Sequence, residues 1–148
     1  MKCYLDTNFL LYLTDPDSPF HQKAISVFEC LVLKSTTLYI SPLILDEFIY
    51  QFRKYILVRS GPKGVYIELD RVLGDILSIP NLKIVNSPVL IRYQKEIIKF
   101  MEKFNLRPRD AYHLLTMRYN KVEYFLTFDN DFKKVFKAKL VLPAREII

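Results

Sequence analysis

Short, mostly apolar stretches alternate along the chain with longer stretches of mixed apolar and polar residues. Five of the short stretches have the length and composition of strands that are covered on both faces. These are residues 2–5, 38–40, 82–85, 124–127 and 140–142.

The longer stretches carry the start and stop signals of helices. Ser-Pro pairs at 41–42 and 87–88, and an Arg-Pro pair at 107–108, place proline where the first turn of a helix tolerates it. The GPKG segment at 61–64 predicts a turn. We expect helices over 18–34, 41–58, from the GPKG turn to 79, 87–104 and 107–120.

Strands that alternate with helices are typical of an α/β fold. The pattern predicts a central, largely parallel five-stranded sheet with helices on both faces. With 148 residues, 51% of them apolar and 26% charged, and with no linker or repeat, the chain fits one domain over 1–148. No apolar run has the length of a membrane span, and no secretory signal is visible. We expect a cytoplasmic protein with no membrane partner, in which Cys3 and Cys30 are reduced.

The segment LDTN at 5–8 places three polar side chains between two apolar runs. Asp6, Thr7 and Asn8 can each cap a helix, because their side-chain oxygens accept hydrogen bonds from free backbone N–H groups. One cap residue is sufficient, so two of the three side chains are free for another role.

Further acids follow other predicted strands or begin predicted helices. Asp129 and Asp131 follow the strand at 124–127, Glu47 lies early in the helix at 41–58, and Asp110 lies in the first turn of the helix at 107–120. In open α/β sheets, ligands bind beyond the carboxyl ends of the strands, so these acids and Asp6 can face one site. A hard divalent cation such as Mg²⁺ or Mn²⁺ would relieve their mutual repulsion.

Each acid also has a purely structural explanation, and these alternatives stay open. Asp6 can cap a helix, Asp110 can favour a helix N-terminus, and Asp129 can belong to a turn. Glu47 can be an ordinary exposed residue, and its neighbour Asp46 is an equal candidate for the site.

The net charge of +6 favours an anionic partner such as nucleic acid. Basic residues near the predicted acids could follow a phosphate backbone, although solubilising faces have the same composition. The candidates for substrate binding are Arg53, Lys54, Arg59, Arg107 and Arg109.

Four motifs, YLDTNFLL, ISPLILDEF, LRPRDAYHLL and FLTFDNDF, occur in this order through nearly the whole chain. With them the chain resembles PIN-domain ribonucleases and, in size and layout, the VapC-like toxins of toxin–antitoxin pairs. The segment 50–79 matches no motif. The resemblance implies an acidic catalytic and metal site, completed by residues that shape and brace it. The acids are Asp6, Glu47, Asp110 and Asp129, with Asp131 as an additional metal ligand, and the shaping residues are Asn8 and Thr127.

The resemblance further implies hydrolysis of RNA phosphodiester bonds by water that one or two Mg²⁺ or Mn²⁺ ions activate. It implies a homodimer and a cognate antitoxin peptide laid over the acidic site, for which the helix at 41–58 offers a surface. Two alternatives remain: a PIN-like module that binds RNA or protein without cutting, and a housekeeping RNA-processing nuclease.

Two other families that gather acids at strand ends fit the sequence less well. A phosphohydrolase of the haloacid dehalogenase type needs a second Asp two positions after Asp6, where this chain has Asn8. A receiver domain needs an Asp after the third strand, where this chain has Asn86 and Ser87. His113 shares a helix face with Asp110, and we expect it to be a packed, hydrogen-bonded histidine rather than a ligand.

Overall fold

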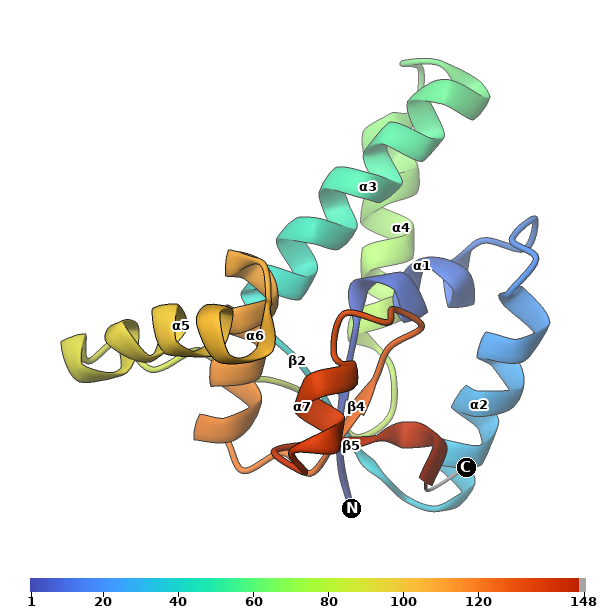
Figure 1. The fold of residues 1–148 in the computed structure, drawn as a ribbon. Coiled ribbons are helices and arrows are strands. Elements are labelled where there is room, and N and C mark those ends of the chain that lie inside the picture. The colour runs from blue at the N-terminus through green and yellow to red at the C-terminus, as the bar shows by residue number, and fades with distance from the viewer. Residues whose placement is uncertain (147–148) are drawn as a thin grey trace.

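The computed structural model describes residues 1–146 of the chain and is built on a five-stranded, all-parallel sheet (Figure 1). The order across the sheet is β3-β2-β1-β4-β5. The strands are β1 (Lys2–Leu5), β2 (Thr37–Ile40), β3 (Leu82–Ile84), β4 (Tyr124–Leu126) and β5 (Leu142–Pro143). The prediction of an α/β fold around a parallel five-stranded sheet is confirmed.

Helices fill the connections between the strands and cover both faces of the sheet (Figure 1). No helix within residues 1–146 is both long and apolar enough to cross a membrane. The helices are α1 (Thr7–Thr14), α2 (His21–Leu33), α3 (Pro42–Ser60), α4 (Val65–Leu77), α5 (Ile91–Phe104), α6 (Pro108–Tyr119) and α7 (Lys133–Lys137), followed by a short 3-10 turn, η1 (Ala144–Glu146).

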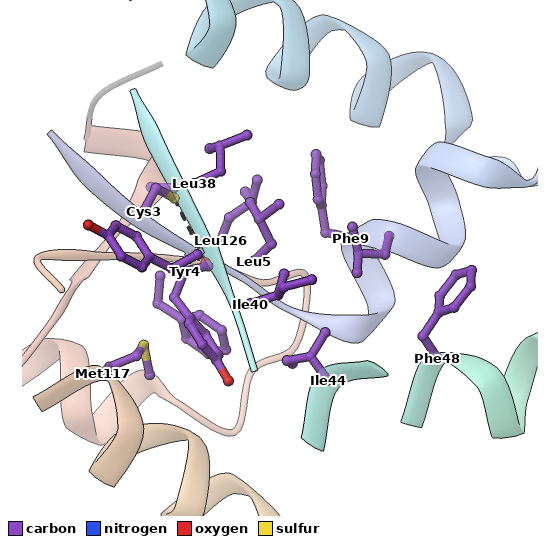
Figure 2. Packing of buried hydrophobic residues seen from close by; sticks show 14 of the residues in the cluster. Cys3, Tyr4, Leu5, Phe9, Leu38, Ile40, Ile44, Phe48, Met117 and Leu126 are labelled. Carbon is purple, nitrogen blue, oxygen red and sulfur yellow. Dashed lines mark hydrogen bonds between the residues drawn. The ribbon is translucent and has the colours of Figure 1, made fainter. Parts of the chain in front are cut away.

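The two faces of the sheet pack against different helices. Tyr4 and Phe125 lie opposite one another on β1 and β4, so their rings share a face. On that face the ring of Tyr4 lies 5.9 Å from the ring of His113 on α6. Figure 2 shows Phe9 of α1 and Met117 of α6 on opposite sides of β1 and β2. The apolar core therefore holds the central strands from both sides, as their continuous hydrophobic runs require.

Helices α3 and α4 form an antiparallel pair that projects from the sheet (Figure 1). The base of α3 belongs to the core, because Phe48 and Phe52 are buried and their rings stack 5.3 Å apart. At the tip, Gly61 (φ 73°) and Gly64 (φ 82°) adopt left-handed backbone conformations that glycine enters without strain. The predicted GPKG turn is present there.

The chain reverses its direction of progress across the sheet next to β1. After β1 it continues outward through β2 and β3, then returns to place β4 on the other side of β1. Such a switch point leaves a crevice at the carboxyl ends of the two strands. Here the backbone N–H of Asp6 donates to the carbonyl of Leu126 at 3.0 Å, so β1 and β4 stay paired up to the edge of that crevice.

Several element boundaries differ from the prediction. The helix expected from 87 begins at Ile91, because the Ser87 hydroxyl bonds to Thr116 on α6 instead of capping α5. The strand expected over 140–142 is β5, two residues later, because Leu140 belongs to the turn that ends α7. Helices α1 and α7 were not predicted as elements.

The hydrogen bonds of Ser41, the N-cap residue of α3, lead to a prediction about stability. The buried Ser41 hydroxyl accepts a bond from the backbone N–H of Ile44 at 3.4 Å and lies 2.6 Å from the hydroxyl of Tyr4. We expect Ser41→Ala to lower the free energy of unfolding in urea by about 2 kcal/mol, since it removes a helix cap and a buried partner together. The matched control is Ser26→Ala, whose hydroxyl bonds Gln22 on an exposed surface and whose loss should cost under about 0.5 kcal/mol. Equal losses in the two variants would contradict this account.

Candidate active site

A cavity of about 410 Å³ lies at the carboxyl ends of β1 and β4. Its lining comes from β1–α1, α3, α6 and the loop after β4, segments far apart in the sequence. The lining residues are Asp6, Thr7, Asn8, Tyr12, Glu47, Gln51, Arg109, Asp110, His113, Phe128, Asp129 and Phe132. The structure thus brings Asp6, Glu47, Asp110 and Asp129 to one cavity.

Asp6 is fixed between the two central strands. One carboxylate oxygen accepts a bond from the backbone N–H of Thr7 at 2.7 Å, which caps α1. The other accepts a short bond from the hydroxyl of Thr127, at the end of β4. Asp6 is therefore both a cap and a bridge across the switch point.

Asn8 braces the loop that follows β4. Its amide nitrogen donates to the hydroxyl oxygen of Thr127 at 3.2 Å, and its carbonyl oxygen accepts from the backbone N–H of Phe128 at 3.2 Å. The backbone N–H of Asp129 donates to the same Thr127 oxygen at 2.9 Å. Thr127 thus joins three parts of the site, although its own side chain does not line the cavity.

Glu47 is the buried acid of the set, and three side chains hold its carboxylate. The hydroxyl of Thr7 donates to Oε2 at 2.9 Å, and Nε2 of His113 lies 3.3 Å from the same oxygen. Nη1 of Arg109 lies 3.6 Å from Oε1. The neighbouring Asp46 is exposed, so the structure places Glu47, not Asp46, in the cavity.

A series of buried hydrogen bonds connects Glu47 to the core through His113 and Tyr4. Nδ1 of His113 lies 3.2 Å from the hydroxyl of Tyr4, which lies 2.6 Å from the hydroxyl of Ser41. Because an ionised carboxylate only accepts hydrogen bonds, Nε2 of His113 carries the proton that it donates to Glu47. With a neutral ring, Nδ1 then accepts from Tyr4 and Tyr4 accepts from Ser41. The sheet, α3 and α6 are joined at this point.

The acids of the cavity differ in their electrostatic state. Burial raises the pKa of Asp6 despite its hydrogen bond from Thr127, and the charge of Glu47 adds to the rise. Burial also raises the pKa of Asp110, with repulsion from Asp131 and Asp129. Burial acts in the same direction on Glu47, but the partners His113, Thr7 and Arg109 outweigh it and lower the pKa of that carboxyl. Negative charge at Asp6 and Asp110 is only partly compensated.

This donor set suits a hard divalent cation in its chemistry. Carboxylate oxygens are the ligands that Mg²⁺ and Mn²⁺ favour, and uncompensated acids gain from a cation. Within residues 1–146, no three His, Cys, Asp or Glu side chains already stand close enough to enclose an ion. Mg²⁺ commonly keeps several waters and takes only one or two carboxylates directly, so lining acids of this kind fit it.

The other predicted residues lie at different places. Arg109 lines the cavity, while Arg53, Lys54, Arg59 and Arg107 do not. Arg59 pairs with Glu68 at 2.8 Å, on the arm formed by α3 and α4. Asp131 is exposed outside the lining and acts on Asp110 through its charge.

Sequence reasoning missed several lining residues. Thr7 belongs to the LDTN segment, in which Asp6 and Asn8 both bond Thr127 while Thr7 bonds Glu47, so the surplus noted in the sequence was a usable signal. His113 is packed and hydrogen-bonded as expected, and it also lines the cavity. No sequence signal distinguished Tyr12, Gln51, Phe128 and Phe132.

The chain is similar to known proteins in sequence and in fold. A family model described as the PIN domain matches residues 3–137. Ribonuclease VapC6 of Methanocaldococcus jannaschii is 26% identical over 128 residues, which cover 77% of this chain and 82% of the relative.

Two solved structures share the fold. VapBC2 from Rickettsia felis, bound to a DNA fragment from its promoter, superposes with a TM-score of 0.69 at 21% identity, over 96% of this chain and 97% of the other. VapC20 from Mycobacterium tuberculosis, a toxin that cleaves the sarcin–ricin loop, gives a TM-score of 0.63 at 15% identity, over 90% and 94% of the two chains.

The raised pKa of Asp110 predicts a stabilising substitution. Burial, with repulsion from Asp131 and Asp129, raises the pKa of Asp110, although His113 and the free N–H groups at the start of α6 favour the charged form. We expect Asp110→Asn to raise the free energy of unfolding by up to about 1 kcal/mol at pH 7 in chelator. The folded carboxyl holds its proton more tightly than the unfolded one, so the native chain loses stability as pH rises from the ordinary value of 3.8 through the folded pKa. The gain in the variant should therefore vanish as pH falls to that value.

The control for this substitution is Asp70→Asn on the exposed surface of α4, which should change stability by less than about 0.5 kcal/mol at either pH. A loss of stability in Asp110→Asn at pH 7 would show that the helix dipole, not repulsion, dominates at this position.

Proposed function

The chain belongs to the PIN domain family, and we propose that it is a Mg²⁺- or Mn²⁺-dependent endoribonuclease that hydrolyses RNA phosphodiester bonds. One observation carries the proposal: acids from four distant segments line one cavity at the switch point of the sheet, and burial raises the pKa of two of them. The name of the relative from Methanocaldococcus jannaschii, a ribonuclease, supports the same activity.

The cation would be held by Asp6, Glu47, Asp110 and Asp129. Asp131 lies near enough for its charge to raise the pKa of Asp110. A bound Mg²⁺ or Mn²⁺ supplies an activated water and compensates negative charge at the scissile phosphate. This chemistry needs no histidine base, and the carboxylates need only hold their charge and position.

The residues of the chain itself perform the positioning. Thr127 and the backbone N–H of Thr7 fix both oxygens of Asp6, and Thr7 and His113 fix one oxygen of Glu47. Arg109 is largely exposed at the cavity, so its guanidinium can meet a phosphate while it lies near Glu47. Preorganised carboxylates lose little entropy when a substrate arrives, which favours the transition state.

We further assign the chain the role of a toxin in a toxin–antitoxin pair, in the cytoplasm, as a homodimer with a cognate antitoxin. The support is the likeness in fold to VapBC2 and to VapC20, over nearly the full length of each. On α3, Phe48 and Phe52 are buried while Ile49 is exposed, so only part of this helix is free for a partner.

The test is cleavage of a mixed RNA with Mn²⁺, with Mg²⁺ and with chelator. We expect cleavage with either ion and none with chelator. Asp6→Asn and Asp110→Asn should each lose at least about a hundredfold in rate, and the double variant should lose little more, because the two acids act through one site. Losses that multiply would contradict a shared site, and full activity in Asp6→Asn would remove the catalytic assignment.

Each of these variants should remain folded, and the native chain should gain thermal stability with rising Mn²⁺ concentration, since a cation that binds only the folded state stabilises it. The control, Asp70→Asn, should keep both the cleavage and the Mn²⁺ response. A native chain that binds Mn²⁺ and RNA without cutting would favour the binding-module alternative.

His113 acts as a positioning residue for Glu47, and His113→Leu tests this role. We expect the Mn²⁺ concentration for half-maximal stabilisation, and for half-maximal rate, to rise about 10- to 100-fold, because groups that orient a metal ligand contribute on this scale. KM for RNA should change little. His113→Gln, whose amide can donate to Glu47, should recover part of the loss. An unchanged Mn²⁺ dependence in a folded His113→Leu protein would show that His113 serves packing alone.

A further inference from the structure

A second concave region lies on the flank of the molecule and shares no lining residue with the candidate active site. It consists of two adjoining hollows, of about 680 Å³ and about 570 Å³. Arg118, Lys121 and Leu140 line both, so the hollows form one continuous surface that we call the flank groove. It is bordered by α5, by the end of α6 and by the segments that precede β4 and β5.

The flank groove is strongly basic. Its lining holds five cationic side chains, namely Lys99, Lys103, Arg118, Lys121 and Lys139, against the two acids Glu96 and Glu123. Among residues 1–146, none of the five cations lies within 4.0 Å of a carboxylate oxygen. Nη1 of Arg118 donates to the carbonyl of Leu140 at 3.2 Å, which holds its guanidinium where the hollows meet.

Two of these lysines occupy backbone positions that lysine does not favour. Lys121 (φ 53°) follows the end of α6, and Lys139 (φ 52°) follows the end of α7. Both helix ends close with the same pair of backbone hydrogen bonds. After α6, Lys121 N–H donates to the carbonyl of Arg118 and Val122 N–H to that of Met117. After α7, Lys139 N–H donates to the carbonyl of Phe136 and Leu140 N–H to that of Val135. Glycine is preferred at this position because it lacks a β-carbon, and asparagine is tolerated because its short polar side chain bonds locally; other side chains cost about 1 kcal/mol there.

This backbone cost is repeated at two helix ends, and both lysines face the same hollow. The same conformation and bonds also end α2 at Ser35, outside the groove, so the feature specific to this surface is that both turns place a lysine in one hollow. The common property of the two side chains is their positive charge.

Aromatic rings lie beside the cations. Tyr93 and Tyr119 meet edge to face, with ring centroids 5.3 Å apart, and half of the surface of Tyr119 is exposed. Phe100 lines the same hollow. Tyr93 and Phe100 are partly buried, so Tyr119 offers the exposed ring. An exposed ring next to lysine and arginine suits unpaired bases, which stack on aromatic side chains while their phosphates meet the cations.

From this combination we propose that the flank groove binds a single-stranded segment of RNA beyond the cavity where the proposed cleavage occurs. The inference rests on the proposed function for the identity of the nucleic acid as RNA. Helix α6 connects the two regions, because Asp110 lies in its first turn and Arg118 in its last. Eight residues of helix span about 12 Å, so one strand can contact both.

The main test is the double variant Lys121→Asn/Lys139→Asn, since asparagine tolerates the left-handed backbone and removes both charges. Binding of a short, labelled, mixed-sequence RNA to the full chain is measured in chelator, where cleavage does not interfere. We expect the affinity to fall roughly tenfold, and the slope of log affinity against log salt to decrease by about 1.4. Stability should be unchanged or higher, because the backbone cost is relieved.

The matched control is Lys63→Asn/Lys83→Asn, which makes the same change in net charge at exposed positions outside the flank groove. It should retain nearly native affinity and salt dependence. Equal effects of the two pairs would overturn the proposal, since net charge alone would then explain binding.

Tyr119→Leu tests the aromatic part separately. We expect affinity to fall about fivefold or more with an unchanged salt slope, because stacking releases no counterions. A perfectly paired duplex of the same sequence should bind more weakly than the single strand. Equal binding of single strand and duplex, or equal binding of poly-glutamate, would overturn the assignment to single-stranded RNA, as would no binding of RNA by the native chain.

The two proposals fail in different ways. If the native chain cleaves RNA with Mn²⁺ while Lys121→Asn/Lys139→Asn binds RNA as the native chain does, the flank groove is not a binding site and the nuclease assignment stands. If the double variant weakens RNA binding while the native chain cleaves no RNA, the flank groove is supported and the nuclease assignment fails.

Discussion

The short hydrogen bond from the hydroxyl of Thr127 to the carboxylate of Asp6 is the contact on which the arrangement of the cavity depends. It joins the ends of β1 and β4, which the chain brings together only at the switch point of the sheet. A hydrogen bond to a charged group contributes about 1.5–3 kcal/mol, and the same Thr127 oxygen also accepts from Asn8 and from the backbone of Asp129. Without it, the loop that carries Asp129 would lose its fixed relation to Asp6, and the partly buried charge of Asp6 would lose its main neutral donor.

The acids of the cavity fall into two electrostatic groups: the charge of Glu47 is compensated by its partners, whereas the charges of Asp6 and Asp110 are compensated only in part. Glu47 is buried yet its pKa is lowered, because His113, Thr7 and Arg109 compensate its charge. Asp6 and Asp110 keep raised pKa values, since burial and neighbouring acids act on them with fewer partners. If every acid were compensated as Glu47 is, the site would have little affinity left for a cation. If no acid were compensated, repulsion among the carboxylates would destabilise the folded site. The buried hydrogen bonds from Ser41 through Tyr4 to His113 join Glu47 to the core, so the fold itself holds the groups that compensate Glu47.

Local signals in the sequence were sufficient for the strands, for most of the helices and for the convergence of the acids, since Asp6 and Asp129 follow strands whose carboxyl ends must share an edge of the sheet. Local signals were insufficient where a residue distant in the sequence determines a side chain's hydrogen bond or the start of a helix. Ser87 has the signature of a helix cap, but Thr116 of α6 takes its hydroxyl, and α5 begins at Ile91 instead. The contact from Thr7 to Glu47 joins residues 40 positions apart, and no spacing rule predicts it. The catalytic and metal-binding roles of these residues remain predictions that geometry alone supports.

The distribution of positive charge follows from the same electrostatics. Cations packed among the acids would compensate them and compete with a metal ion, so a cavity of this kind can tolerate few, and Arg109 is the one arginine or lysine in its lining. The attraction needed to hold a polyanion must then come from surfaces outside the cavity, where cations do not meet the acids. The sequence alone suggested Arg53, Lys54 and Arg59 on α3, but Arg59 is already paired with Glu68. On the flank groove, by contrast, five cations lie near the exposed ring of Tyr119, and two of them hold backbone conformations that lysine rarely adopts. Separate acidic and basic surfaces joined by α6 thus satisfy both requirements, a cavity that keeps its negative charge and a flank that attracts a phosphate backbone.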